Sequence, residues 1–139
     1  MKNLNFGTPE KPLELKTPPG SSIFFVYRDF KYDTEVIACV VRKTSLYYDI
    51  QCIWDLQEML LEYGDWMELG SKDEKQDAKP NTIEYWGRSS ENPVGGWYGL
   101  RKGFRGRFGM YIPPLMEYLG LAELTHEKRG NKMRAIPNK

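Results

Sequence analysis

The amino-acid sequence predicts an α+β fold, in which a three-stranded antiparallel sheet precedes a mainly helical half with a C-terminal β-hairpin. Over the first fifty residues, runs of β-branched and aromatic side chains are typical of strands. From residue 52 onward the apolar spacing changes to three and four residues, which is typical of helices. The chain has 139 residues, of which 40% are hydrophobic and 14% aromatic, and this is enough to bury a core.

The first twenty residues are predicted to form an extended, proline-rich arm. They hold four prolines, which exclude a regular helix and favour extended backbone. The arm is expected either to lie against the domain or to be mobile. Residues 21–139 are predicted to form a single α+β domain, with the sheet in 21–51 and the helical part in 52–136.

Three runs predict the strands of the N-terminal sheet. Residues 21–30 and 35–43 are rich in β-branched and aromatic residues, and the turn at 31–34 joins them into a hairpin. Residues 45–50 add a third strand, because every second side chain is apolar and these side chains share one face.

An amphipathic helix is predicted over residues 53–63. Its apolar side chains recur at intervals of three and four, and Gly64 is placed to end it in a left-handed conformation. A short extended stretch at 66–69 and a short helix at 82–88 follow.

Residues 89–109 are unusual because six glycines are interleaved with four aromatic side chains. This composition argues against a long regular helix. The next helix is predicted at 112–119, entered through Pro113 and Pro114, since proline fits a first helical turn.

The chain is predicted to end in a β-hairpin. Its strands lie at 121–126 and 132–136, and Gly130 or Asn131 takes positive φ in the connection. The predicted core combines large apolar side chains from all of these elements: Ile23, Phe25, Val36, Ile37, Val40, Ile53, Leu56, Leu60, Trp66, Trp86, Tyr111, Leu115, Leu119 and Leu124.

From residue 52 onward, the order of predicted elements resembles a winged helix-turn-helix domain. This resemblance implies that the helix at 112–119 enters a DNA groove and that the hairpin at 121–136 is the wing. Two features depart from that pattern. The link between the second and third helices is long, and the third helix has few of the Arg, Lys, Asn or Gln side chains that read bases.

A second resemblance covers nearly the whole chain. It is carried by the sequence GRSSENPVGGWYGLRKG at 87–103, by RGRFGMY at 105–111, by residues 121–134 and by TPEKP at 8–12. These segments are similar to small uncharacterised bacterial proteins that are grouped as a domain of unknown function. The resemblance implies a bacterial cytosolic protein and transfers no activity.

The sequence contains no recognisable catalytic or metal-binding motif, so no catalytic residue, metal or cofactor is predicted. His126 is the only histidine, and it is expected to be a surface or half-buried polar residue. Cys39 and Cys52 are expected to be buried and structural, since two thiols make neither a disulfide framework nor a four-ligand zinc site.

The chain is predicted to be cytoplasmic. Its longest apolar runs, Ile23–Tyr27 and Val36–Val41, are far shorter than the roughly 20 residues of a transmembrane helix. Its polar, proline-rich start does not resemble a secretory signal, and its low cysteine content fits a reducing compartment.

The charge of the chain is distributed unevenly. Residues 1–87 hold 10 basic and 15 acidic side chains, whereas residues 88–139 hold 10 basic and 4 acidic ones. This asymmetry indicates either a polyanionic partner or two halves of opposite charge that face each other within the fold. Eight basic residues in two short windows are the candidate anion-binding residues: Arg101, Lys102, Arg105 and Arg107 in the first, and Lys128, Arg129, Lys132 and Arg134 in the second.

The two basic windows suggest three alternative functions. The first is nucleic-acid binding or regulation, with arginines on phosphates and Trp97, Tyr98 and Phe104 stacking on bases. The second is binding of an acidic protein. The third, and least favoured, is an enzyme acting on a phosphorylated small molecule. The sequence leaves the oligomeric state open.

Overall fold

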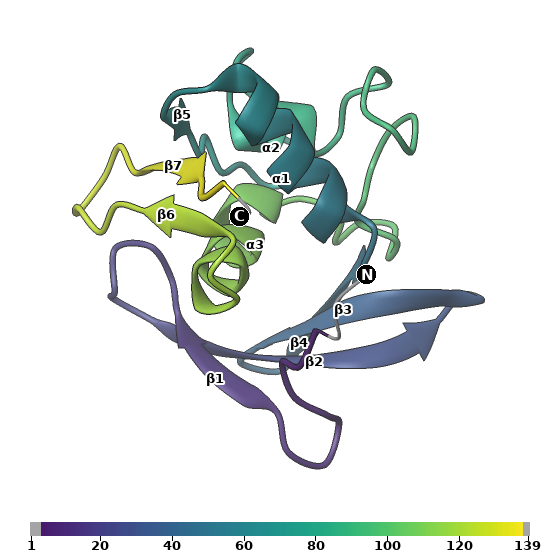
Figure 1. Ribbon diagram of the computed structural model, residues 1–139. Coiled ribbons are helices and arrows are strands. Elements are labelled where there is room, and N and C mark those ends of the chain that lie inside the picture. The colour runs from purple at the N-terminus through teal and green to yellow at the C-terminus, as the bar shows by residue number, and fades with distance from the viewer. Residues whose placement is uncertain (1–3, 138–139) are drawn as a thin grey trace.

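The computed structural model describes residues 4–137 of the chain. An N-terminal four-stranded antiparallel sheet is followed by three helices and a small three-stranded antiparallel sheet (Figure 1). This arrangement confirms the α+β class. The large sheet has the order β1-β2-β3-β4 and consists of β1 (Leu13–Lys16), β2 (Ile23–Lys31), β3 (Thr34–Val41) and β4 (Thr44–Asp49).

The sheet has four strands rather than the predicted three. The additional strand, β1, lies within the proline-rich arm and pairs antiparallel with β2, so that Leu13 faces Val26 and Lys16 faces Ile23. Pro12 and Pro18 stand outside the strand, where their missing N–H groups cost no bond of the ladder. The predicted arm is therefore in part a strand of the sheet.

Strand β2 presents the opposite face to that predicted. Phe24 and Val26 are buried, whereas Ile23 is 50% exposed and Phe25 is half-buried. Side chains alternate between the two faces of a strand. A prediction that is wrong by one residue therefore assigns every buried side chain to the exposed face and every exposed one to the core.

The second half contains α1 (Cys52–Tyr63), β5 (Met67–Glu68), α2 (Ile83–Trp86), α3 (Phe108–Tyr118), β6 (Ala122–Leu124) and β7 (Lys132–Ala135). Gly64 follows α1 at φ 74°, as predicted. The hairpin of β6 and β7 is also confirmed, with Gly130 at φ 71°, and β5 joins it to give the order β5-β7-β6. No helix of the described residues is both long enough and apolar enough to span a bilayer.

Helix α3 begins four residues before its predicted start and lies between the two sheets, where it contacts β1 and β6 (Figure 1). Pro113 and Pro114 therefore lie inside the helix rather than in its first turn. The first turn forms because the Arg107 carbonyl accepts from the amides of Met110 and Tyr111, and because its apolar side chains are buried.

One hydrophobic core joins the two sheets and the helices. Eight of the predicted core residues are buried, five are half-buried and Ile23 is exposed. The prediction missed several of the largest buried side chains: Phe24, Tyr48, Tyr98, Phe108 and Ile112.

Part of the glycine-rich segment runs along the outer edge of β4. The Tyr98 carbonyl accepts from the Asp49 amide at 2.8 Å, and the Leu100 amide donates to the Tyr47 carbonyl at 2.8 Å. Gly99 lies between these bonds, and a Cβ there would lie 2.6 Å from the Arg105 backbone. Glycine is required at this position because the two stretches of backbone approach so closely.

Candidate nucleic-acid interface

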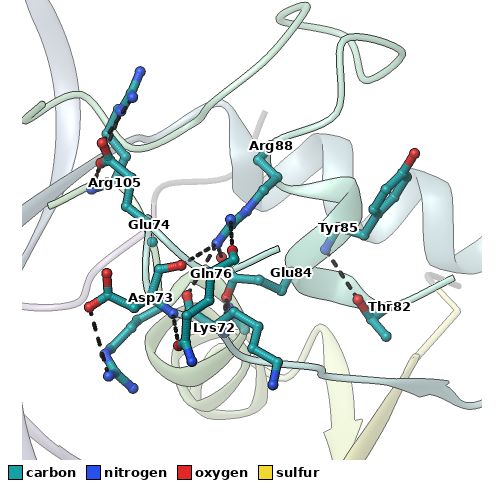
Figure 2. A network of polar contacts seen from close by, with 12 residues as sticks. Lys72, Asp73, Glu74, Gln76, Thr82, Glu84, Tyr85, Arg88 and Arg105 are labelled. Carbon is teal, nitrogen blue, oxygen red and sulfur yellow. Dashed lines mark hydrogen bonds and ion pairs between the residues drawn. The ribbon is translucent and has the colours of Figure 1, made fainter. Parts of the chain in front are cut away.

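One buried carboxylate, that of Glu84 in α2, joins segments that flank the first basic window (Figure 2). It accepts from the amide of Gly109 at 2.9 Å, from the amide of Lys72 at 3.3 Å and from the guanidinium of Arg88 at 2.8 Å. The carboxylate thus holds the first turn of α3 and the loop after β5 together. Thr82 caps α2 by accepting from the Tyr85 amide.

Arg88 extends this network to the loop at 72–76. Its Nη2 donates to the Lys72 carbonyl and its Nη1 to the Gln76 carbonyl, at 3.1 and 2.8 Å. Its guanidinium also lies 4.4 Å from the centre of the Trp97 ring. Arg88 is therefore a structural cross-link rather than a free charge.

Arg105 of the first basic window is held by a second carboxylate, that of Glu74 (Figure 2). Its Nε and Nη2 donate to the two Glu74 oxygens at 3.0 and 2.9 Å, and its amide donates at 2.7 Å. These bonds lower the pKa of Glu74 to about 2. At Gly106, a Cβ would lie 2.3 Å from the Glu74 amide, so the two loops are in close contact.

The other basic residues of the first window have different surroundings. Arg101 is half-buried, donates to the Ser45 carbonyl at 2.8 Å and lies 4.1 Å from the Phe104 ring centre. Arg107 lies 3.9 Å from an Asp73 oxygen in a loose ion pair, and both of these side chains are nearly half exposed. Lys102 is exposed. The first window therefore offers mainly Lys102 and Arg107 to a ligand.

The structure limits base stacking to Phe104. Tyr98 is fully buried, with its ring stacked against Trp86 and Phe108 at 5.2 and 5.6 Å, so its predicted role in stacking is wrong. Trp97 is half-buried, and two guanidinium groups lie within 4.5 Å of its ring centre. Phe104 is 40% exposed.

In the second basic window, Lys128, Arg129 and Lys132 are all exposed. Arg134 instead donates to Glu123 at 2.7 Å across the hairpin and lies 4.5 Å from the Trp66 ring centre. The window thus provides three side chains that are open to solvent.

Helix α3 does not have the surface of a DNA-reading helix. Eight of its eleven residues are buried, and no residue of Phe108–Tyr118 is basic. A helix that enters the major groove must expose side chains able to bond to base edges. The structure therefore gives no support to DNA reading in the manner of a winged helix.

His126 joins the hairpin to the N-terminal sheet. Its Nδ1 lies 2.8 Å from the Pro18 carbonyl and its Nε2 lies 2.7 Å from a Glu117 oxygen. The hydrogen bond to Glu117 is the main cause that raises the pKa of His126 above its usual value. In Figure 1 the connection between β1 and β2 lies beside the β6–β7 hairpin.

Two neighbouring cavities lie where these segments meet. The first, of about 600 Å³, is lined by residues 103, 104, 106 and 107 of the basic loop, and the second, of about 580 Å³, by residues 129–131 of the hairpin. Pro19 and Met110 line both cavities. The fold thus brings parts of the two basic windows to adjacent hollows. Other polar residues that line the two cavities were not predicted from the sequence: Arg42, Ser71, Lys72, Lys79 and Tyr111.

The two cysteines are part of the core. Cys39 and Cys52 are buried as predicted, and burial raises the pKa of both thiols. Within the described residues, no three His, Cys, Asp or Glu side chains are grouped as metal ligands would be.

Comparison with known proteins identifies a family but no function. No curated protein and no solved structure matches the chain. One family model, described as a family of unknown function (DUF6855), matches residues 5–136. This match spans both sheets, all three helices and both cavities, and it agrees with the resemblance carried by residues 87–111. The chain belongs to the family of unknown function DUF6855.

Proposed function

We propose that the chain binds nucleic acid through the groove formed by the two neighbouring cavities, without strong sequence preference. One observation carries this proposal: segments of the two basic windows, more than twenty residues apart in the chain, line hollows that share Pro19 and Met110. Arg107 lies at the first hollow and Arg129 at the second. A row of exposed cations along a groove suits a phosphate backbone.

Phosphate contacts dominate the proposed binding. The exposed cations in and beside the groove are Arg and Lys side chains, which position a backbone and carry little sequence information. The carboxylates of Glu68 and Asp73 also line the two cavities, and both side chains are nearly half exposed. The Ser71 hydroxyl adds a further polar group, since its oxygen is buried without a hydrogen-bond partner among the described residues and Ser71 lines the second cavity. Phe104 supplies an exposed ring on which a base of any sequence stacks.

The test is a fluorescence-anisotropy titration with labelled oligonucleotides of about 20 nucleotides at several salt concentrations. We expect a dissociation constant on the order of 10⁻⁴–10⁻⁶ M at physiological salt, with affinity falling as salt rises. The Arg107→Ala/Arg129→Ala double variant should bind more weakly to every sequence and show a smaller salt slope, by up to about 0.9 per lost duplex contact.

The matched control removes two exposed lysines that line neither cavity, Lys11 and Lys31. This Lys11→Ala/Lys31→Ala variant has the same net charge as the groove variant and should retain nearly wild-type binding. Equal weakening in the two variants would indicate only a general charge effect, which contradicts the groove. Absence of binding at low salt would overturn the proposal and favour an acidic protein as the partner.

A further inference from the structure

The first cavity brings together two arginines from distant parts of the chain. Arg42 is in the turn between β3 and β4, and Arg107 immediately precedes α3. Both are exposed, and both line the hollow of about 600 Å³. Four serine and threonine residues of the lining, Thr17, Ser21, Ser22 and Thr44, offer further hydrogen-bonding groups.

Both arginines have left-handed backbone conformations. Arg42 has φ 58° and Arg107 has φ 61°. Non-glycine residues adopt this region rarely, and glycine or asparagine is the usual choice there. Glycine is therefore the substitution that best preserves the backbone at both positions.

Tyr111 forms part of the same cavity wall as the two arginines. Burial raises the pKa of its hydroxyl, and the charges of Arg107 and Arg42 oppose that rise. Arg42, Arg107 and Tyr111 all line this one hollow. Two cations and a phenol in the wall of one cavity suit a ligand that carries several anionic oxygens.

The carboxylates of the cavity leave part of this positive charge free. Glu74 is engaged by Arg105, whose guanidinium neutralises it. Asp73 accepts from the Lys75 amide at 3.1 Å and makes a loose 3.9 Å ion pair with Arg107. Arg42 and Arg107 therefore outweigh Asp73, and a phosphate is able to compete with Asp73 for Arg107.

The remaining wall is apolar. Ile23 and Phe104 are 50% and 40% exposed, respectively, and both line this cavity together with Met110. Exposed apolar side chains beside paired arginines suit a ligand with a flat ring as well as a phosphate. We propose that the first cavity binds the phosphomonoester of a nucleotide, with the phosphate on Arg42 and Arg107 and the ring against Phe104.

The test is isothermal titration calorimetry with AMP, and with adenosine and inorganic phosphate as partial ligands. We expect AMP to bind more tightly than either partial ligand. Arg42→Gly and Arg107→Gly should each weaken AMP binding about tenfold or more, because each removes a charge-assisted contact. Glycine suits positive φ, so melting temperatures close to wild type are the expected evidence that these variants are folded.

Two further variants make the test specific. Lys43→Gly removes the same charge from the neighbouring turn position, which does not line the cavity, and should leave AMP binding unchanged. Asp73→Asn should strengthen AMP binding, since it removes the only competitor for Arg107 among the ion pairs described. Absence of AMP binding at millimolar concentrations, or equal effects of Arg42→Gly and Lys43→Gly, would overturn the site.

The source of the phosphomonoester is distinguished with oligonucleotides that have a 5′-phosphate or a 5′-hydroxyl. If the protein prefers the 5′-phosphorylated oligonucleotide and Arg42→Gly abolishes that preference, the ligand is the end of a nucleic-acid strand. If the protein binds AMP tightly but shows no such preference, the ligand is a free nucleotide. The site shares Arg107 and Phe104 with the proposed nucleic-acid groove, but the two proposals are tested separately. If the protein binds AMP but no oligonucleotide, only the nucleic-acid proposal is refuted. If it binds oligonucleotides but not AMP, only the nucleotide site is refuted.

Discussion

The basic loop (residues 101–107) and the basic hairpin (residues 128–134) each carry four basic side chains, but their surroundings differ. In the loop, Arg105 is fixed by both oxygens of Glu74, and Arg101 is fixed by the Ser45 carbonyl. In the hairpin, three of the four side chains extend into solvent. The fold thus holds two of the four basic side chains of the loop, whereas in the hairpin only Arg134 is held by an ion pair among the described residues.

This difference arises from carboxylates that lie far away in the sequence. Glu74 precedes Arg105 by 31 residues, so no local pattern reveals the pair. The hairpin has only Glu123 across from Arg134, and its remaining cations have no such partner among the described residues. Whether a basic segment is available to a ligand is therefore decided by the tertiary structure and not by its own charge.

The largest expected effect is that of Glu84→Ala, which removes the carboxylate on which the loops converge. Arg88 would lose its buried partner, and two backbone amides would lose their acceptor. Breaking a buried pair in this way costs about 3–5 kcal/mol of unfolding free energy. Urea unfolding measures the loss, and Glu68→Ala, at an exposed ion pair, should cost about 0–1 kcal/mol. A loss at Glu84 no greater than that at Glu68 would contradict the structural role of this network.

A smaller effect is expected for Arg105→Ala, and it addresses the comparison of the two segments directly. Loss of a bidentate, mostly buried ion pair should cost about 1–3 kcal/mol, whereas Arg129→Ala should stay within about 0.5 kcal/mol. Oligonucleotide binding should show the opposite order, with the larger loss for Arg129→Ala. If both variants lose stability equally, the two segments do not differ as described.

The ion pair between Arg105 and Glu74 should make the stability of the protein sensitive to acid. The pKa of Glu74 is about 2 in the folded state, below its ordinary value of 4.5, so its ionised form favours folding. That stabilisation is complete above pH 4.5 and is lost as the pH falls toward about 2. Stability curves for wild type and Glu74→Gln should therefore converge in this range. Curves that remain parallel would show that the ion pair contributes nothing.

The smallest effect on stability is expected at His126. Its dependence on pH is opposite in sign to that of Glu74. Its pKa is raised above 6.5, mainly by Glu117 and also by the Pro18 carbonyl, so its protonated form favours folding. This stabilisation is complete below pH 6.5 and is lost as the pH rises through the folded-state value. Melting temperatures on both sides of that range should decline less in Glu117→Gln than in wild type. An unchanged decline would exclude this pair as the cause.

The sequence predicted the elements whose patterns are local. Strands β2 to β4, helix α1 and the β6–β7 hairpin all follow from apolar spacing and from glycine at the right positions. Strand β1 was missed because its four residues stand among prolines, which favour extended backbone without specifying a partner. The early start of α3 was missed because glycines precede it, and the buried carboxylate that supports that start lies in another helix.

The candidate site was less predictable, since proximity in space defines it. Arg107 and Arg129 were identified from the charge of their windows. Arg42 carries no sequence signal of its own, and Tyr111 was predicted only as a core residue. Both line the cavity only when β3, β4 and α3 pack together. Tyr98 has the composition of a stacking platform but fills the core instead. Residue type alone does not separate a ring that binds from a ring that packs.

The pairing of the glycine-rich segment with β4 has a consequence for how copies of the chain interact with one another. A sheet edge with unpaired N–H and C=O groups is a template for the strand of another molecule. Tyr98 and Leu100 occupy two such groups on β4. We therefore expect substitutions that displace this segment, such as any side chain at Gly99, to expose a β-edge and to promote intermolecular strand addition. The pairing would then protect the protein against aggregation, independently of ligand binding.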